Sequence, residues 1–132
     1  MRKTLLTAVL MIGITAPAHS AYFESYSDWR ATSEAQKGGF VMGVYDARFS
    51  IISENAGYPD PYREANSVGA RDCFLKLRLN SVMLVQLVET YYAQNPDTWA
   101  LLSGFVVEQA IMKLCKTDIN DVRKKMGLIL IK

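Results

Sequence analysis

The sequence predicts an all-α fold: a small single-domain bundle of four to five helices with one intramolecular disulfide. Three observations favour this class. Apolar residues recur at helical spacing along almost the whole chain, and no strand–turn–strand or βαβ pattern interrupts them. The third observation is the cysteine count, because two cysteines in an exported chain form an even pair.

The N-terminal residues 1–20 have the three parts of a secretory signal peptide. A basic start is followed by an apolar run from Leu5 to Ile14 and then by small residues. The run is too short to span a bilayer, which requires about 20 apolar residues. We expect export to the periplasm with cleavage near Ser20/Ala21, a cut after Ala18 being the alternative. No stable membrane insertion is expected after cleavage.

Cleavage changes the composition of the chain that folds. Arg2 and Lys3 are lost, so the 15 basic residues become 13 and equal the 13 acidic residues. A neutral chain lacks the basic surplus that binding to phosphates needs, so we expect no nucleic-acid partner. His19 is the only histidine and is lost too, which removes the commonest general base and metal ligand. We therefore expect no catalytic residues, no metal and no cofactor.

Residues 21–132 then form one domain, of a size at which a covalent link helps stability. Cys73 and Cys115 are predicted to form its disulfide, because disulfides persist in oxidising compartments. Loop-closure entropy predicts a stabilisation of about 4 kcal/mol for a ring of this length. The alternative is a pair of buried free thiols.

Two helices are predicted in the N-terminal half. The first is short, Tyr22 to Ala35, and the second runs from Lys37 to Asn55. On the second helix Val44 and its apolar neighbours form one arc, whereas Asp46 lies on the opposite side with glycines and serines. Arg48 lies within the apolar arc, which predicts either an arginine whose head reaches water or a buried partner for a carboxylate.

The segment from Gly57 to Asp72 is predicted to be a long loop, with at most one helical turn near Pro61. Long loops in small domains are often functional. This one contains Tyr58, Tyr62 and Arg63, and tyrosine and arginine are frequent in binding hot spots. We predict these three residues as the partner-binding site.

The C-terminal half contains the remaining helices. One spans Val82 to Asn95, capped by Asn80 or Ser81, and the next starts at Asn95-Pro96 and ends near Leu114. Tyr91, Tyr92 and Trp99, at the corner between them, are expected in the core. A last short helix covers Asp118 to Gly127, and the apolar end of the chain, "LILIK", is either a docked strand or a tail in a groove. Residues 117–132 as a whole could instead be a flexible tail.

Carboxylates offer the remaining route to catalysis, which needs two acids on converging faces. The candidates are Asp46, Glu89 and Glu108. Nothing in their spacing distinguishes them from solvated surface positions. An enzyme is therefore the least favoured hypothesis.

The order of several motifs resembles the Rap/Tai family of periplasmic immunity proteins, which protect bacteria from type VI secretion amidase effectors. The resemblance covers roughly residues 38–116 and is carried by these residues: Gly43-Val44-Tyr45-Asp46, Cys73, Tyr91-Tyr92, Asn95-Pro96, Ala110 and Cys115. It makes Gly43, Asp46, Asn95 and Pro96 signatures of the fold. The chain departs from the family pattern at Phe74-Leu75-Lys76 and at Leu114, and its tail is longer.

The resemblance implies a non-enzymatic periplasmic protein that neutralises a peptidoglycan amidase by occluding its active site. The expected partner is thus a secreted cell-wall amidase, and a homodimer is left open. The alternative is a periplasmic acid or stress chaperone of the small helical, single-disulfide type, which loosens at low pH because its many carboxylates lose their charge.

Overall fold

The computed structural model describes residues 23–50 and 60–132. These residues contain six α-helices, a π-helical turn and a 3-10 turn, and no strand, so the all-α prediction is confirmed. The elements are α1 (Tyr26–Ala31), α2 (Glu34–Tyr45), the π-turn η1 (Asp46–Ser50), α3 (Pro61–Leu77), α4 (Ser81–Gln94), the 3-10 turn η2 (Pro96–Thr98), α5 (Ser103–Leu114) and α6 (Lys116–Lys125).

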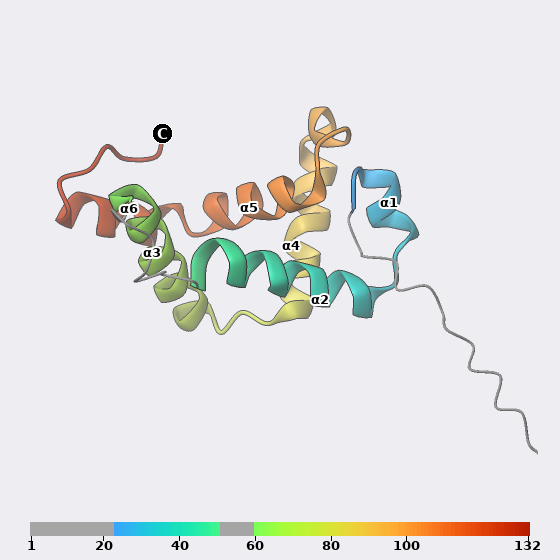
Figure 1. The fold of residues 1–132 in the computed structure, drawn as a ribbon, viewed down its shortest axis with the longest axis horizontal. Coiled ribbons are helices and arrows are strands. Elements are labelled where there is room, and N and C mark those ends of the chain that lie inside the picture. Colours follow the sequence, from blue (N-terminus) through green and yellow to red (C-terminus); the bar gives the residue numbers. More distant parts are fainter. Residues whose placement is uncertain (1–22, 51–59) are drawn as a thin grey trace, which may run out of the picture.

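Helices α2, α4 and α5 pack on one another and form the centre of the molecule. Figure 1 shows α2 and α5 side by side with α4 crossing them, while α1 lies at one end and α3 and α6 lie at the other. All six helices contribute to one buried cluster, which joins the two ends through the centre. Its largest fully buried side chains are Trp29, Tyr92, Leu84, Ile111, Ile119, Val41, Val88, Val106 and Val107.

Helices α1 and α2 are separated by a short non-helical connection at Thr32 and Ser33, whereas the sequence predicted a first helix that continues to Ala35. Ser33 caps α2: its hydroxyl accepts from the backbone N–H of Gln36, and the Gln36 side chain accepts from the backbone N–H of Ser33. This capping box satisfies two backbone N–H groups at the start of α2, which in a continuous helix would donate to carbonyls of the preceding turn. Consequently α1 ends at Ala31, and α2 starts before the predicted Lys37.

Helix α2 ends at Tyr45, and the chain continues as a π-helical turn from Asp46. The regular α-helix thus ends ten residues before Asn55, its predicted end. Residues 51–55 lie outside the described residues. Val41 and Tyr45 are buried, whereas Gly43 and Asp46 are exposed, as the helical wheel predicted. Arg48 is displaced from the apolar arc by the π-turn, and its side chain is 61% exposed. The alternative of a buried Arg48 is therefore wrong.

Helix α3 occupies most of the segment predicted to be a loop. Asp60 caps it by accepting from the backbone N–H of Tyr62, and Pro61 takes the first helical position, which suits its fixed φ and missing donor. From Pro61 onward, the proline, glycine and asparagine content that suggested a loop lies in a helix instead, and the small residues of the segment are buried. They are Ala65, Ser67, Gly69 and Ala70. The prediction of a loop from Gly57 to Asp72 was wrong from Pro61 onward.

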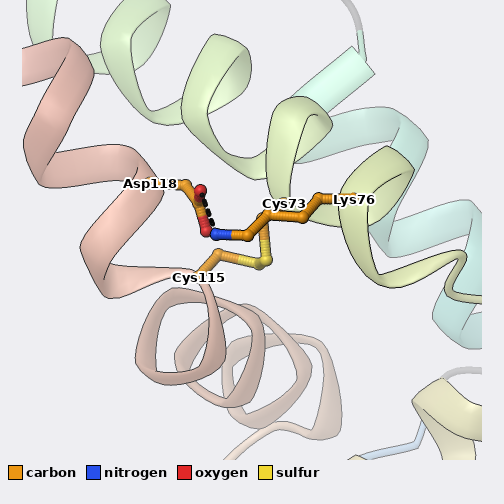
Figure 2. The surroundings of a disulfide bond; sticks show 4 residues. All are labelled: Cys73, Lys76, Cys115 and Asp118. Carbon is orange, nitrogen blue, oxygen red and sulfur yellow. Dashed lines mark hydrogen bonds and ion pairs between the residues drawn. A yellow bond between two sulfur atoms is a disulfide. The ribbon is translucent and has the colours of Figure 1, made fainter.

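These small residues allow α3 to approach α6 closely. A Cβ added to Gly69 would lie 2.7 Å from the backbone nitrogen of Ile119, so the two helix backbones are in contact there. One turn later the Cys73–Cys115 disulfide, with a Cα–Cα distance of 5.6 Å, links residues 42 positions apart. The predicted disulfide is confirmed. Figure 2 shows the ion pair beside it, in which Lys76 Nζ lies 3.0 Å from Asp118 Oδ1.

Arg123 completes this α3–α6 interface near the other end of α6. Its guanidinium donates two hydrogen bonds, of 3.0 and 2.8 Å, to Asn66 Oδ1 and lies 5.2 Å from the centroid of the Tyr62 ring. Tyr62, Asn66, Gly69 and Cys73 recur at steps of four and three, so they share one face of α3. The interface combines a covalent link, a glycine contact and charged contacts along this single face.

The connection between α4 and α5 also differs from the prediction. Asn80 caps α4 as expected, accepting from the backbone N–H of Met83. Asn95, predicted to cap the following helix, instead donates its side-chain amide to the carbonyl of Tyr91 and ends α4. Pro96 starts only a 3-10 turn, and α5 begins at Ser103.

The residues that follow α6 are hydrogen-bonded back to α6. The backbone N–H groups of Gly127 and Leu128 donate to the carbonyls of Lys124 and Arg123, and Gly127 has a φ of 68°, which is the usual C-terminal arrangement with glycine. The segment considered as a tail then folds back. The backbone of Ile131 exchanges two hydrogen bonds, of 2.8 and 3.0 Å, with the side chain of Asn120.

Candidate functional site

The predicted binding residues do not form a loop surface. Tyr58 lies outside the described residues. Tyr62 and Arg63 lie in the first turn of α3, where Tyr62 is covered by Arg123 and Arg63 donates a long hydrogen bond of 3.5 Å to the carbonyl of Ala47. Both side chains thus have intramolecular contacts that a partner would have to replace.

Two of the three candidate catalytic carboxylates form ion pairs, each with a different basic residue. Glu89 lies 2.8 Å from Lys37 Nζ, and Glu108 lies 3.4 Å from Arg48 Nε. Asp46 is exposed at the junction of α2 and η1. Within the described ranges, no three histidine, cysteine, aspartate or glutamate residues are grouped closely enough to hold a metal ion.

Lys37 is the one basic side chain that the described core buries. It is 6% exposed, lies 5.5 Å from the centroid of the Trp29 ring, and pairs with both Glu34 and Glu89 at 2.8 Å. Burial by itself lowers the pKa of Lys37, but the hydrogen bonds and charges of the two carboxylates raise it more, so the pKa lies above the usual lysine value. Lys37 therefore fastens α2 to α4 as a charged group.

The most distinctive surface lies at the connection between α4 and α5, which projects at the top of the molecule in Figure 1. Four large apolar side chains are exposed there within seven residues: Trp99 (47%), Leu101 (39%), Leu102 (47%) and Phe105 (48%). We call these four residues the apolar corner. Single exposed apolar residues are ordinary, whereas large exposed apolar patches often mark interaction surfaces, so four such residues close in sequence are a candidate for one.

The polar atoms of Trp99 are bonded inside the protein. Its indole N–H donates to the carbonyl of Tyr92 at 3.0 Å, and its own carbonyl accepts from the backbone N–H of Tyr26 at 3.0 Å. The Tyr26 ring packs beside the indole with centroids 4.9 Å apart. The indole is thus held in place while half of its surface faces outward.

Ser103 connects the corner to the N-terminal segment. Its backbone N–H, at the start of α5, donates to the carbonyl of Phe23 at 3.1 Å, and its hydroxyl accepts from the Tyr92 phenol at 2.9 Å. Burial raises the pKa of Tyr92, and the hydrogen bond to Ser103 opposes this effect. Because α5 has no side-chain N-cap, this tertiary hydrogen bond replaces one.

A groove of about 350 Å³ continues from the corner between α2 and α5. Its wall is apolar except at one end, where Arg48 pairs with Glu108. Gly104 contributes no side chain to this groove. A Cβ at that position would occupy part of the groove without a clash, since it would lie 3.9 Å from side-chain atoms of Phe40 and Val44. The lining residues are Phe23, Phe40, Val44, Ala47, Arg48, Leu102, Gly104 and Phe105.

A larger hollow, of about 480 Å³, lies between α2 and α4. It is lined by Gly38, Gly39 and short or aliphatic side chains, with Glu34 at its edge. It lacks the adjoining exposed aromatic residues that the corner provides. We therefore take the apolar corner and its groove as the candidate site.

The candidate site was missed because Trp99 was assigned to the core. That assignment was wrong, whereas Tyr92, another aromatic residue of the same helix–helix corner, is fully buried as predicted. The apolar content of "TWALLSGF" was a usable signal, since it exceeds what one helix face can bury. Comparison with protein-family models, curated proteins and solved structures returned no match for this chain.

Proposed function

We propose that this protein is an exported, non-catalytic binding protein whose apolar corner docks into a partner protein. The single observation that supports the corner is that a half-exposed tryptophan, Trp99, is held in place by an internal hydrogen bond and a ring contact with Tyr26, with a half-exposed Phe105 six residues later. Residues that are already ordered lose little conformational entropy on binding. Tryptophan is also the residue type most enriched among binding hot spots.

The proposed partner is a secreted peptidoglycan amidase, and the proposed mechanism is steric occlusion of its active site. The resemblance to the Rap/Tai immunity proteins suggests this class, and a disulfide between two helices suits an oxidising compartment. The connection between α4 and α5 projects from the helical body, so it could enter a cleft together with the first turn of α5, which carries Phe105. The adjoining groove would accept an apolar side chain from the rim of that cleft.

The experiment is inhibition of purified secreted cell-wall amidases of the same cell, beginning with any hydrolase that the neighbouring genes encode. The Trp99→Ser/Phe105→Ser variant should weaken binding by about 1,000-fold, since hot-spot residues cost about 2 kcal/mol or more each. A second variant, Leu101→Ser/Phe105→Ser, keeps the Trp99 hydrogen bonds and guards against unfolding. The matched control is Leu75→Ser/Val82→Ser, which alters two exposed apolar residues, 72% and 63% exposed, on α3 and α4.

Substitution at the start of α3 distinguishes the two candidate surfaces. Tyr62→Ala/Arg63→Ala should leave inhibition unchanged if the corner binds the amidase. Loss of inhibition in this variant, with normal inhibition by both corner variants, would instead place the binding surface at the start of α3. Full inhibition by every variant would remove both surfaces from the proposal.

An acid-responsive chaperone is a second candidate, because charged pairs join separate elements of the fold. Lys37–Glu89 links α2 to α4, and Lys76–Asp118 links α3 to α6. Protonation of the carboxylates would leave Lys37 buried without an opposite charge, which favours loosening. Retention of full near-UV circular dichroism at pH 2, with no suppression of client aggregation, would eliminate this candidate.

A further inference from the structure

The far end of the molecule from α1 carries a second exposed surface, made by the end of α6 and the last residues (Figure 1). Met126, Ile129 and Leu130 are 38%, 73% and 46% exposed, and Lys124, Lys125 and Lys132 beside them are exposed as well. We call these six residues the basic end. Its sequence, "KKMGLILIK", places lysines on both sides of an apolar segment.

The backbone of this segment is fixed by contacts with α6. Gly127 makes the turn, Asn120 holds both backbone polar groups of Ile131, and Arg123 Nη1 donates to the carbonyl of Ile129 at 3.1 Å. Ile131 packs against the core while Ile129 remains the most exposed large apolar residue in the described chain. The side chains of Ile129 and Leu130 therefore face solvent, while hydrogen bonds to α6 hold the backbone of this segment in place.

Along α6 and the residues that follow it, the charged side chains are predominantly positive, with five basic residues against two acidic ones. Among the described residues, Asp118 is paired with Lys76 at 3.0 Å, and Arg123 is engaged by Asn66. Asp121 is exposed one turn before Lys125 and offsets one cation. Within α6 and the last residues, the three lysines of the basic end thus outnumber Asp121, the exposed acidic residue of that segment, although the chain without residues 1–20 is formally neutral.

We propose that the basic end binds reversibly to the surface of an anionic phospholipid bilayer. Exposed lysines are attracted to anionic headgroups, and apolar side chains at the same level enter the boundary between headgroups and acyl chains. No helix in the part of the chain that the structure describes is long and apolar enough to cross a membrane. The contact is peripheral, and it uses residues remote from the apolar corner.

The test is co-sedimentation with vesicles of phosphatidylglycerol and phosphatidylcholine in equal amounts, against pure phosphatidylcholine vesicles. Protein is taken from the exported fraction, so that parent and variants share one N-terminus, which mass spectrometry checks. The parent should bind only the anionic vesicles. Raising the ionic strength from about 0.01 M to about 0.15 M should weaken this binding, because the Debye length falls from about 30 Å to about 8 Å.

Two variants separate the charged and apolar contributions. Lys124→Gln/Lys125→Gln/Lys132→Gln should lower the partition coefficient on the order of 100-fold, about fivefold per lysine. Ile129→Ser/Leu130→Ser should lower it by at least about tenfold, since a buried side chain contributes about that much or more. Both variants must retain the parent melting temperature, because Ile131, Asn120 and Arg123 are unchanged.

The controls make failure of this proposal separate from failure of the amidase proposal. The Trp99→Ser/Phe105→Ser variant should bind anionic vesicles like the parent, and the lysine variant should inhibit an amidase like the parent. Equal binding of the parent to neutral and anionic vesicles would overturn the proposal, as would no binding to either. Parent-like binding by the Ile129→Ser/Leu130→Ser variant would overturn insertion and leave a contact with phosphate groups alone.

Discussion

The α3–α6 interface and the apolar corner differ in which residue types they enclose and which they expose. Polar and small residues lie between the helices at the interface, whereas large apolar residues are exposed at the corner. At the interface, a charged guanidinium, an amide and a glycine lie between two helices, because Arg123 and Asn66 bond to each other and Gly69 admits the backbone of α6. At the corner, Trp99 and Phe105 face outward. In both regions, burial follows the segment that lies opposite each residue and not hydrophobicity alone: Gly69 is buried against the backbone of α6, whereas Trp99 is half exposed although its polar atoms are satisfied.

The largest expected effect is removal of the disulfide from the α3–α6 interface. Cys73→Ala/Cys115→Ala should lower the free energy of unfolding by about 4 kcal/mol, because the unfolded chain regains the entropy of a large open loop. Urea denaturation followed by circular dichroism measures this change. A loss below about 1 kcal/mol would mean that glycine packing and the Arg123 contacts hold the interface without the covalent link.

A smaller effect is expected from adding one methyl group at the same interface. Gly69→Ala should cost about 3 kcal/mol, since overpacking against a backbone forces the helices apart. Gly104→Ala in α5 is the matched control: its Cβ meets side chains only at 3.9 Å, so the higher helix propensity of alanine should stabilise by up to about 1 kcal/mol. Equal effects of the two substitutions on denaturation midpoints would contradict the close approach at Gly69.

The next effect concerns the buried charge that links α2 to α4. Glu34→Gln/Glu89→Gln should cost about 1–2 kcal/mol by leaving Lys37 unpaired, a value reduced from the fully buried case because Glu34 is 74% and Glu89 45% exposed. Lys37→Met should change stability by less than about 1 kcal/mol, because an apolar side chain replaces the lysine and both carboxylates keep access to water.

The pH dependence of Lys37 provides a separate measurement. Its pKa is raised in the folded state, so its contribution is fully present below the unfolded pKa and is lost as the pH rises through the folded pKa. Chemical denaturation of the parent and Lys37→Met from neutral to alkaline pH should show the parent alone losing this increment. Parallel curves throughout would show that the ammonium makes no net contribution.

The smallest effect on stability is expected at the apolar corner. Leu101→Ser/Phe105→Ser alters residues that are 39% and 48% exposed, so the free energy of unfolding should fall by less than about 1 kcal/mol. Thermal denaturation measures this change as a shift in the melting temperature. This result would sharpen the comparison, because substitutions of large apolar residues at the corner would cost less than one methyl group at Gly69. A loss of several kcal/mol would show that the corner is part of the core.

Several elements could be predicted because their signals lie within a few residues. Asn80 before an apolar run marks the start of α4, and Gly127 after a lysine-rich turn marks the end of α6. Two cysteines in a chain predicted to be exported allow only one intramolecular pairing, so the disulfide required no geometry. The start of α3 had a comparable signal in Asp60-Pro61, but the small residues after it concealed the helix.

The start of α5 and the candidate site could not be predicted in this way. Ser103 begins α5 by donating to the carbonyl of Phe23, a residue far away in the sequence. The same contact and the Tyr26–Trp99 hydrogen bond turn the chain so that Trp99 and Phe105 face outward. Apolar spacing reports which residues share a helix face, and it does not report which face another segment covers.

The helical class, the pairing of Cys73 with Cys115, and the ends of the helices with local caps follow from the amino-acid sequence alone. For the helices, the reason is that periodicity and capping depend on residues within about one turn of each other. Three other features depend on how the helices pack: Gly69 forms a helix contact, Lys37 is buried and pairs with two carboxylates, and the apolar corner is exposed. Each of these depends on which distant segment lies opposite, and no spacing within a single helix specifies that neighbour.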